Sequence, residues 1–233
     1  MKCLSRLGIA HRISREFQDG EVVNLGTGIP SMCADFAEDR GEVLLHSEQG
    51  LLGFGRRARF EGEVNPQLLN ASRQPVTPKA GMCLMDHAES FALIRGGRID
   101  IAVLAAIQVS VDGDLANCWL PGAAAGGLGG AQDLAFRARR VIAALPLIPH
   151  APRLVKKLSL EMTCPKCVTC IVSELGVVYL NRGRATLTEL VDGWSVSDVQ
   201  QLVEVDLAIP AQGPARMDVP DWMPELWTVA QER

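Results

Sequence analysis

Apolar residues recur along the chain at two spacings, one typical of helices and one of buried strands. Near the start they recur every three or four positions and stop at Asp19-Gly20, which predicts an opening helix. Short apolar runs predict buried strands at residues 22–25, 43–45, 99–107 and 141–145. Helical stretches are expected between them at residues 31–38, 90–94 and 131–138. This alternation predicts an α/β fold, an open and mostly parallel sheet with helices on both faces.

The rest of the pattern adds local detail. Residues 108–117 contain the turn dipeptide Asp112-Gly113 and predict a short excursion from the sheet. Further strands are expected at residues 170–179 and 185–191, and a helix at 197–203 that a Ser197…Gln200 capping box opens. No repeat or linker divides the chain, so we expect a single domain over residues 1–209. Residues 210–233 hold four prolines with Trp222 and Trp227, and predict an irregular C-terminal tail.

Three loops contain glycine, at residues 26–30, 46–55 and 122–130. The first two follow predicted strands, and the third follows the predicted excursion at residues 108–117. Such loops gather at the carboxyl ends of parallel strands, where ligands bind, although glycines also serve in tight turns with no ligand. The middle loop carries Glu48 between apolar residues, which would desolvate the carboxylate and favour its use as a nucleophile or base. Most loop glutamates face solvent, so the pattern alone leaves both interpretations of Glu48 open.

The charge and the apolar runs of the chain argue against nucleic acid and membranes as partners. The 233 residues hold 23 Lys and Arg against 27 Asp and Glu, a net charge of −4, which argues against nucleic acid as a partner. Charged residues interrupt the first twenty positions, and no later apolar run reaches bilayer length. We therefore expect a cytoplasmic protein that does not enter a membrane.

Seven cysteines without an export signal indicate reduced thiols. Cys164, Cys167 and Cys170 have spacings that suit zinc, but a fourth ligand is missing and we expect no metal. Cys170 is expected to point into the sheet as a small apolar residue. His46, beside Glu48, either tunes that carboxylate or closes its strand as a structural histidine.

Six segments occur in the order found in one enzyme family. They are residues 23–30 (VNLGTGIP), 47–53 (SEQGLLG), 70–77 (NASRQPVT), 90–97 (SFALIRGG), 113–117 (GDLAN) and 127–134 (GLGGAQDL). Over residues 5–208 the chain resembles the beta (B) subunit of the 3-oxoacid CoA-transferases, which are class I CoA-transferases.

The resemblance implies that Glu48 is the nucleophile of a ping-pong CoA transfer. Glu48 would take CoA from a donor such as succinyl-CoA or acetyl-CoA and pass it to a 3-oxo or other short carboxylic acid. Coenzyme A would be the substrate and the covalent intermediate, and no separate cofactor is expected. The family's active site lies between two similar subunits, so an alpha subunit is the expected partner, in a heterodimer or heterotetramer.

The resemblance also implies the remaining site residues. Backbone amides would stabilise oxyanions and hold CoA, and the candidates are Gly26, Gly28, Gln49, Gly50, Gly129 and Gly130. Arg73 falls near a family lysine of the carboxylate pocket and suits an acid by bidentate pairing, although a surface role stays open. Asn24 and Asn117 are further candidates for the pocket.

Some positions depart from the family pattern. Gln49 replaces the usual asparagine after the glutamate, residues 122–126 lack the usual lysines, and residues 81–87 differ from the expected small and aromatic types. The identity of the acid therefore stays open. The alternative function keeps the fold but uses Glu48 as an acid or base in hydrolysis, decarboxylation or ring cleavage of a CoA thioester. A non-catalytic subunit that retains the pocket is a third hypothesis.

Overall fold

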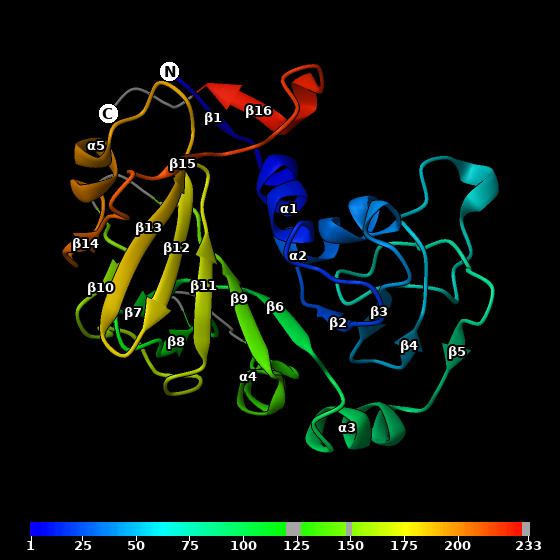
Figure 1. Cartoon of the computed structure of the whole chain (residues 1–233). Helices are drawn as coiled ribbons and strands as arrows, with labels where there is room; N and C mark the ends of the chain where they lie inside the picture. The colour runs from blue at the N-terminus through cyan, green and yellow to red at the C-terminus, as the bar shows by residue number, and fades with distance from the viewer. Residues whose placement is uncertain (120–126, 148–150, 230–233) are drawn as a thin grey trace.

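One large twisted sheet forms the frame of the molecule (Figure 1). The computed structural model describes residues 1–119, 127–147 and 151–229. The sheet runs in the order β14-β13-β12-β11-β9-β6-β2-β3-β4-β5, and β15 also pairs with β13. Its strands are β2 (Val22–Leu25), β3 (Leu44–Ser47), β4 (Leu51–Leu52), β5 (Cys83–Leu84), β6 (Ile101–Ala105), β9 (Arg140–Ala144), β11 (Val168–Val172), β12 (Gly176–Asn181), β13 (Arg184–Leu190), β14 (Leu207–Ala208) and β15 (Ala215–Arg216).

The centre of this sheet is parallel. β2 lies between β3 and β6, β9 follows β6, and β11 follows β9, all in parallel pairings. Antiparallel strands extend the sheet through β12 and β13 on one side and through β4 and β5 on the other. The predicted α/β class with an open, mostly parallel sheet is therefore confirmed.

The helices divide between the two faces of the sheet. They are α1 (Arg6–Ser14), α2 (Ile29–Met32), α3 (His87–Arg95), α4 (Ala131–Arg137) and α5 (Val196–Gln200), with 3₁₀ turns at Cys33–Phe36, Glu38–Arg40, Glu61–Glu63 and Pro224–Leu226. In β6, Ile101 and Val103 join the apolar core beneath α1, whereas Ala102 and Leu104 join a second core with α3 and α4. Successive side chains of a strand point to opposite faces, so both faces must be covered.

A small second sheet packs against the face that carries α3 and α4. It has the order β10-β7-β8, from β7 (Gln108–Ser110), β8 (Leu115–Ala116) and β10 (Leu154–Val155). β7 and β8 are antiparallel, and the turn between them places Gly113 at φ 88°. The predicted excursion at Asp112-Gly113 is thus confirmed.

Two predicted elements in the final third were wrong in detail. The strand expected at residues 170–179 is instead the hairpin of β11 and β12, which turns where Ser173 N and Gly176 O form a hydrogen bond of 3.0 Å. The helix expected at 197–203 is α5, which begins earlier. Its N-cap is Ser195, and Asp198 completes the capping box. A carboxylate at the third position suits this box because it accepts the N-cap amide hydrogen.

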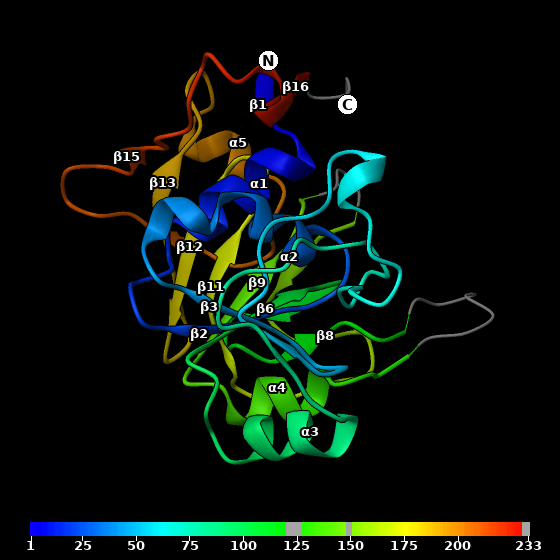
Figure 2. The same cartoon turned by 90° about the vertical axis from the view of Figure 1, so that its right-hand side faces the viewer.

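The C-terminal residues return to the start of the chain. β16 (Trp227–Val229) pairs antiparallel with β1 (Lys2–Leu4), and both lie beside α1 in Figures 1 and 2. Met217, Val219 and Leu226 belong to the core beneath α1. Residues 210–229 are therefore anchored to the core at these three side chains, while the division at residues 209 and 210 stays a prediction. Within the described ranges, no helix is long and apolar enough to cross a bilayer.

Candidate active site

Glu48 lies in an open cleft of about 650 Å³ beside the first turns of α3 and α4. The residue follows β3 directly, so the sheet fixes where its backbone begins. The cleft is lined by Glu48, Gln49, Leu69, Asn70, Ala71, Arg73, His87, Phe91, Arg95, Gly129, Gly130 and Asp133. The structure thus brings five of the predicted site residues together in one cleft, namely Glu48, Gln49, Arg73, Gly129 and Gly130.

The Glu48 side chain is partly buried, and one of its carboxylate oxygens lacks a hydrogen-bond partner among the described residues. Its Oε2 atom is buried and forms no hydrogen bond with the described residues. Burial raises the pKa of this carboxyl, while a backbone hydrogen bond and the nearby His87 lower it by less. Desolvation disfavours the ionised form and makes the carboxylate more reactive as a base or nucleophile.

Gly130 gives the Glu48 side chain its space. A Cβ atom at Gly130 would lie 3.4 Å from Glu48 Cγ and 3.1 Å from the ring of Phe91. The neighbouring Gly129 has φ 49°, a conformation that side chains rarely adopt. Within the described ranges, neither glycine amide takes part in a hydrogen bond as a donor.

Gly50 allows the loop to turn sharply after Glu48. Its φ is 123°, and a Cβ atom there would lie 2.1 Å from the carbonyl oxygen of Met85. The chain approaches this closely because Met85 N donates a hydrogen bond of 3.0 Å to Gly50 O. Gly50 N itself donates to Ser47 O. Only glycine satisfies both the backbone angle and the space at this position.

Gln49 connects the loop that carries Glu48 to the loop that carries Arg73. Its side-chain amide donates to the carbonyl oxygen of Leu69 and accepts from Ser47 Oγ at 2.8 Å. The longer glutamine thus bridges two loops, which gives the departure from asparagine a physical role. The backbone amide of Gln49 takes no part in either of these side-chain bonds.

The first glycine loop uses its amides within the fold. Gly26 N donates to Val103 O at 3.0 Å, and Gly28 N donates to Ser72 Oγ at 2.9 Å. A Cβ atom at Gly26 would lie 3.1 Å from Val103 O, so this glycine permits close packing against β6. Neither Gly26 nor Gly28 lines the cleft with Glu48.

Arg73 projects from a tight turn at the edge of the cleft. Its backbone has φ 58°, and its amide donates to Asn70 O at 2.8 Å. Among the described residues its guanidinium has no ion-pair partner, whereas Arg95 across the cleft is bound to Asp133 at 2.8 Å. Of the two arginines in the described cleft lining, Arg73 is therefore the one without an ion-pair partner.

Asn24 and Asn117 lie outside the cleft lining. Asn24 is fully buried in β2 and donates a hydrogen bond of 2.9 Å to the ring of His46. The side-chain oxygen of Asn117 accepts from Thr163 Oγ1 at 2.8 Å and from Cys118 Sγ at 3.0 Å. Both asparagines therefore serve hydrogen-bond networks within the fold.

Four residues of α3 near Glu48 were missed as site candidates, as were Leu69, Asn70, Ala71 and Asp133 of the cleft lining. His87, Phe91 and Arg95 line the cleft, and Ser90 donates a hydrogen bond of 2.7 Å to the Glu48 carbonyl. All belong to α3, whose sequence is mostly residues 90–97 (SFALIRGG), one of the six family segments. That segment was the available signal, but its distance from Glu48 in sequence concealed the contact.

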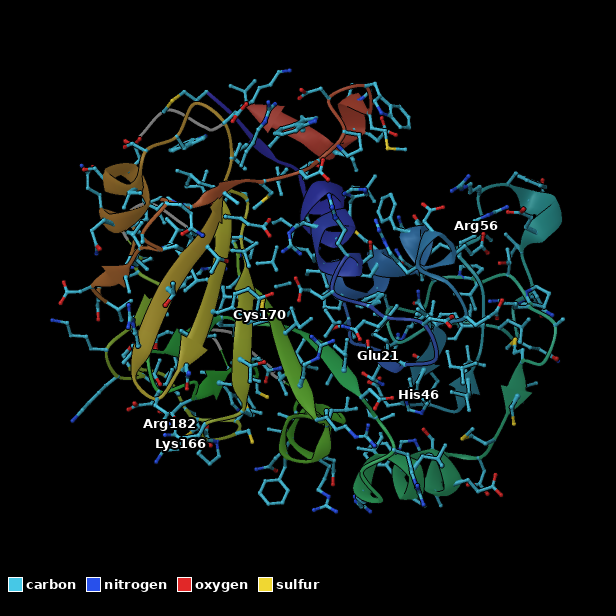
Figure 3. The ribbon with its side chains drawn as sticks, viewed as in Figure 1. Glu21, His46, Arg56, Lys166, Cys170 and Arg182 are labelled. Atoms are coloured by element: carbon cyan, nitrogen blue, oxygen red, sulfur yellow. The ribbon has the colours of Figure 1, made fainter. Side chains whose placement is uncertain are left out.

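The cysteines form no metal site in the part of the chain that the structure describes. Cys164 and Cys170 are buried and Cys167 is partly buried, and all seven cysteines are free thiols. Burial raises the pKa of Cys164, Cys167 and Cys170. Cys170 lies within the apolar core, as expected, and is labelled in Figure 3.

Comparison with known proteins agrees with this geometry. A family model described as coenzyme A transferase matches residues 7–201. The chain is 41% identical to the beta (B) subunit of a probable succinyl-CoA:3-ketoacid coenzyme A transferase of Bacillus subtilis, over 88% of this chain and 95% of the relative. It is 38% identical to the corresponding subunit of the 3-oxoadipate CoA-transferase of Acinetobacter baylyi, over 90% and 98%.

Solved structures support the fold. The acyl-CoA transferase YdiF of Escherichia coli O157:H7 superposes with a TM-score of 0.72 at 19% identity, over 91% of this chain and 43% of that one. Both named relatives are transferases, which favours transfer over hydrolysis, decarboxylation or ring cleavage. The chain therefore belongs to the coenzyme A transferase family, and its relatives place it among the beta subunits.

Proposed function

We propose that this chain is the glutamate-bearing subunit of an enzyme that moves CoA between an acyl-CoA and a short carboxylic acid. The observation that carries the proposal is the Glu48 carboxylate, which is partly desolvated and lacks a hydrogen-bond partner at Oε2 among the described residues, in an open cleft. A structural glutamate in such a position would be expected to have a partner. An unpaired, desolvated carboxylate beside free backbone amides suits covalent catalysis.

The bonds that form and break in this reaction involve only the Glu48 carboxylate and the two substrates. A Glu48 oxygen attacks the thioester carbonyl carbon, the carbon–sulfur bond breaks, and the CoA thiolate leaves a mixed anhydride. The thiolate then attacks the Glu48 carboxyl carbon, which releases the donor acid as a carboxylate and leaves a glutamyl-CoA thioester. The acceptor acid reverses these steps. No net proton or water enters, so the thioester energy is kept.

Two parts of the cleft support this chemistry. Each tetrahedral intermediate carries an oxyanion, which the amides of Gly129 and Gly130 would stabilise beside the Glu48 side chain. Arg73, at the other edge of the cleft, would pair with the carboxylate of the acid. A 3-oxo or dicarboxylic acid fits the subunits to which this chain is similar, which are named for succinyl-CoA:3-ketoacid and 3-oxoadipate transfer.

An alpha subunit is part of the proposal. The named relatives are beta subunits, and the cleft around Glu48 is open to solvent. A thioester site must exclude water to avoid hydrolysis, so we propose that the alpha subunit covers this cleft and binds much of the CoA. The proposed complex works in the cytoplasm and requires no separate cofactor or metal.

Covalent capture tests the function. The purified complex is incubated with acyl-CoA and no acceptor acid, treated with borohydride, and analysed by peptide mass spectrometry. We expect reduction of the Glu48 side chain to the alcohol, and loss of turnover in Glu48→Ala and Glu48→Gln. Glu204→Gln is the matched control, because this glutamate is exposed and lies outside the cleft lining, and it should keep normal turnover.

The outcomes separate the alternatives. Turnover that requires Glu48 but gives no modified peptide would favour an acid or base role in hydrolysis, decarboxylation or ring cleavage. Unchanged turnover in Glu48→Ala would remove Glu48 from the mechanism and favour a non-catalytic subunit.

A further inference from the structure

A chain of buried polar groups runs beneath Glu48. Asn24, His46 and Ser90 come from β2, β3 and α3, and each is completely buried. Asn24 Nδ2 lies 2.9 Å from His46 Nδ1, His46 Nε2 lies 3.1 Å from Ser90 Oγ, and Ser90 Oγ lies 2.7 Å from the Glu48 carbonyl oxygen. Figure 3 labels His46 between β3 and α3. Three elements are thus connected to the backbone of Glu48.

For a neutral His46 ring, the number of hydrogens fixes the direction of every bond in this chain. A carbonyl oxygen only accepts, so the single hydroxyl hydrogen of Ser90 is used on Glu48. Ser90 Oγ must then accept from His46, which places the ring hydrogen on Nε2. His46 Nδ1 is left as an acceptor for the amide of Asn24. If the ring hydrogen were on Nδ1, Ser90 would have to supply the hydrogen for both of its contacts. Either the 3.1 Å contact with His46 Nε2 or the 2.7 Å contact with the Glu48 carbonyl would then have no hydrogen.

The surroundings of His46 agree with a neutral ring. The ring has no carboxylate among its hydrogen-bond partners in the described ranges, and burial lowers the pKa of His46 to about 4. With Asn24 Nδ2 facing the ring, a charged ring would also point an N–H group at that donor nitrogen. The neutral ring therefore carries one hydrogen, directed toward Ser90 and Glu48.

The loop is held at its backbone while the carboxylate stays unbound. Ser90 fixes the Glu48 carbonyl, and the bond from Met85 N fixes Gly50 O at 3.0 Å. By contrast, Glu48 Oε2 has no partner in the described structure. A nucleophile needs both properties, since its position must be set before the substrate arrives and its oxygens must stay free to react.

We propose that Asn24, His46 and Ser90 are positioning residues that hold the Glu48 backbone in place for the attack on the thioester. The proposal rests on the proposed role of Glu48 as the nucleophile. It replaces the interpretation of His46 as a histidine that only closes its strand, because the hydrogen-bond chain ends on the catalytic residue.

Kinetics of the complete complex test the proposal. His46→Leu and Ser90→Ala break the chain, and we expect kcat to fall about 10- to 100-fold because small displacements of a reacting group slow it strongly, with a much smaller change in KM for acyl-CoA. His46→Gln should recover most of this loss, because the glutamine Nε2 donates where the imidazole Nε2 donates. His11→Leu is the matched control. This histidine is buried against Phe36, outside the chain, and kcat should not change.

Two results would overturn the proposal. One is wild-type kcat in folded His46→Leu and Ser90→Ala, and the other is a loss confined to KM. Thermal melting of each complex checks that the variants are folded.

A second measurement does not depend on the variants folding well. In the wild-type complex with ¹⁵N-labelled histidine, one of the chain's four histidines should show a protonated Nε2 and an unprotonated Nδ1 at neutral pH. The signal that disappears in His46→Gln identifies the ring. A His46 with a protonated Nδ1 would reject the hydrogen-bond chain. Failure to capture CoA on Glu48 would instead reject the proposed function, even if this NMR signal were as expected.

Discussion

At the scale of single residues, Glu48 combines reactivity with a cost to the fold. Burial raises its pKa, so the folded protein disfavours the ionised carboxylate that the chemistry needs. The unbound Oε2 adds to that cost, because the buried oxygen has lost water and gained no donor among the described residues. Active sites commonly hold groups in such unfavourable surroundings.

We therefore expect Glu48→Gln to stabilise the chain at neutral pH by about 1 kcal/mol. Because the pKa of Glu48 is raised in the fold, its effect on stability is most favourable when it is protonated. That contribution is lost as the pH rises through the folded pKa. The difference between the variant and the wild type should thus shrink on acidification. Urea unfolding at neutral and acidic pH measures it, and a destabilised variant at neutral pH would contradict the prediction.

The pH dependence of activity has the same origin. In the proposed mechanism the ionised form of Glu48 is the nucleophile, so the rate of CoA capture should fall as the pH drops through a pKa above the usual value for a glutamate. Single-turnover measurements of glutamyl-CoA formation against pH give this value. An acid limb at or below the ordinary glutamate pKa would argue against the desolvated site.

Gly50 leads to a prediction about the stability lost when a methyl group is added at a crowded position. Gly50→Ala would force a side chain into φ 123° and within 2.1 Å of Met85 O, and we expect a loss of about 2–4 kcal/mol in unfolding free energy. Gly213→Ala is the matched control, because Gly213 has φ 81° with no atom near its Cβ position, and should cost about 1 kcal/mol. Chemical denaturation compares the two. Equal losses would mean that the close approach to Met85 contributes nothing.

At the scale of elements, α3 matters because it carries much of the cleft wall. Ser90, Phe91 and Arg95 lie on this helix, and it begins with a capping box of Asp86 and Glu89. The cap fixes where the first turn starts, and hence where Ser90 lies relative to Glu48.

Asp86→Ala should therefore cost about 1 kcal/mol of stability, because the amide of Glu89 loses its acceptor. Asp86→Asn keeps an acceptor oxygen and should lose only a fraction of that amount. Urea denaturation of both variants measures the difference. If alanine and asparagine behaved alike, the capping bond would not stabilise α3.

The elements also show how far the sequence could predict the structure. The central strands and the turn at Asp112-Gly113 were predicted because buried strands and turn dipeptides have local signals. The hairpin turn at residues 173–176 was missed because Leu175, with apolar residues on both sides of the turn, resembles part of one continuous strand. Glu48 was chosen as the candidate nucleophile through its motif, whereas the bond from Ser90 joins residues 42 positions apart, which no local pattern reveals.

At the scale of the whole molecule, the packed C-terminal segment should be important for stability. Leu226 is 0% exposed, and its carbonyl oxygen lies so close to Gly8 that a Cβ atom there would be 2.1 Å away. This contact joins the last part of the described chain to α1. Neither Gly8 nor Leu226 lines the Glu48 cleft.

Leu226→Ala should therefore cost about 2–5 kcal/mol, since it removes buried methyl groups and leaves a cavity. Val229→Ala is the control in the same segment, because Val229 is 71% exposed and its truncation should have little effect. Thermal unfolding separates the two. A small effect of Leu226→Ala would show that residues beyond 209 behave as a separate tail.

The hydrogen bond from Ser90 to the Glu48 carbonyl also bears on how the enzyme acquires activity during folding. It joins residues 42 positions apart, and folding that depends on contacts between residues far apart in sequence is slower than the formation of a helix or a turn. The proposed nucleophile is thus placed only when the long-range contacts form. Recovered catalysis in a refolding experiment therefore reports the arrival of native tertiary order, whereas circular dichroism responds earlier to the helices.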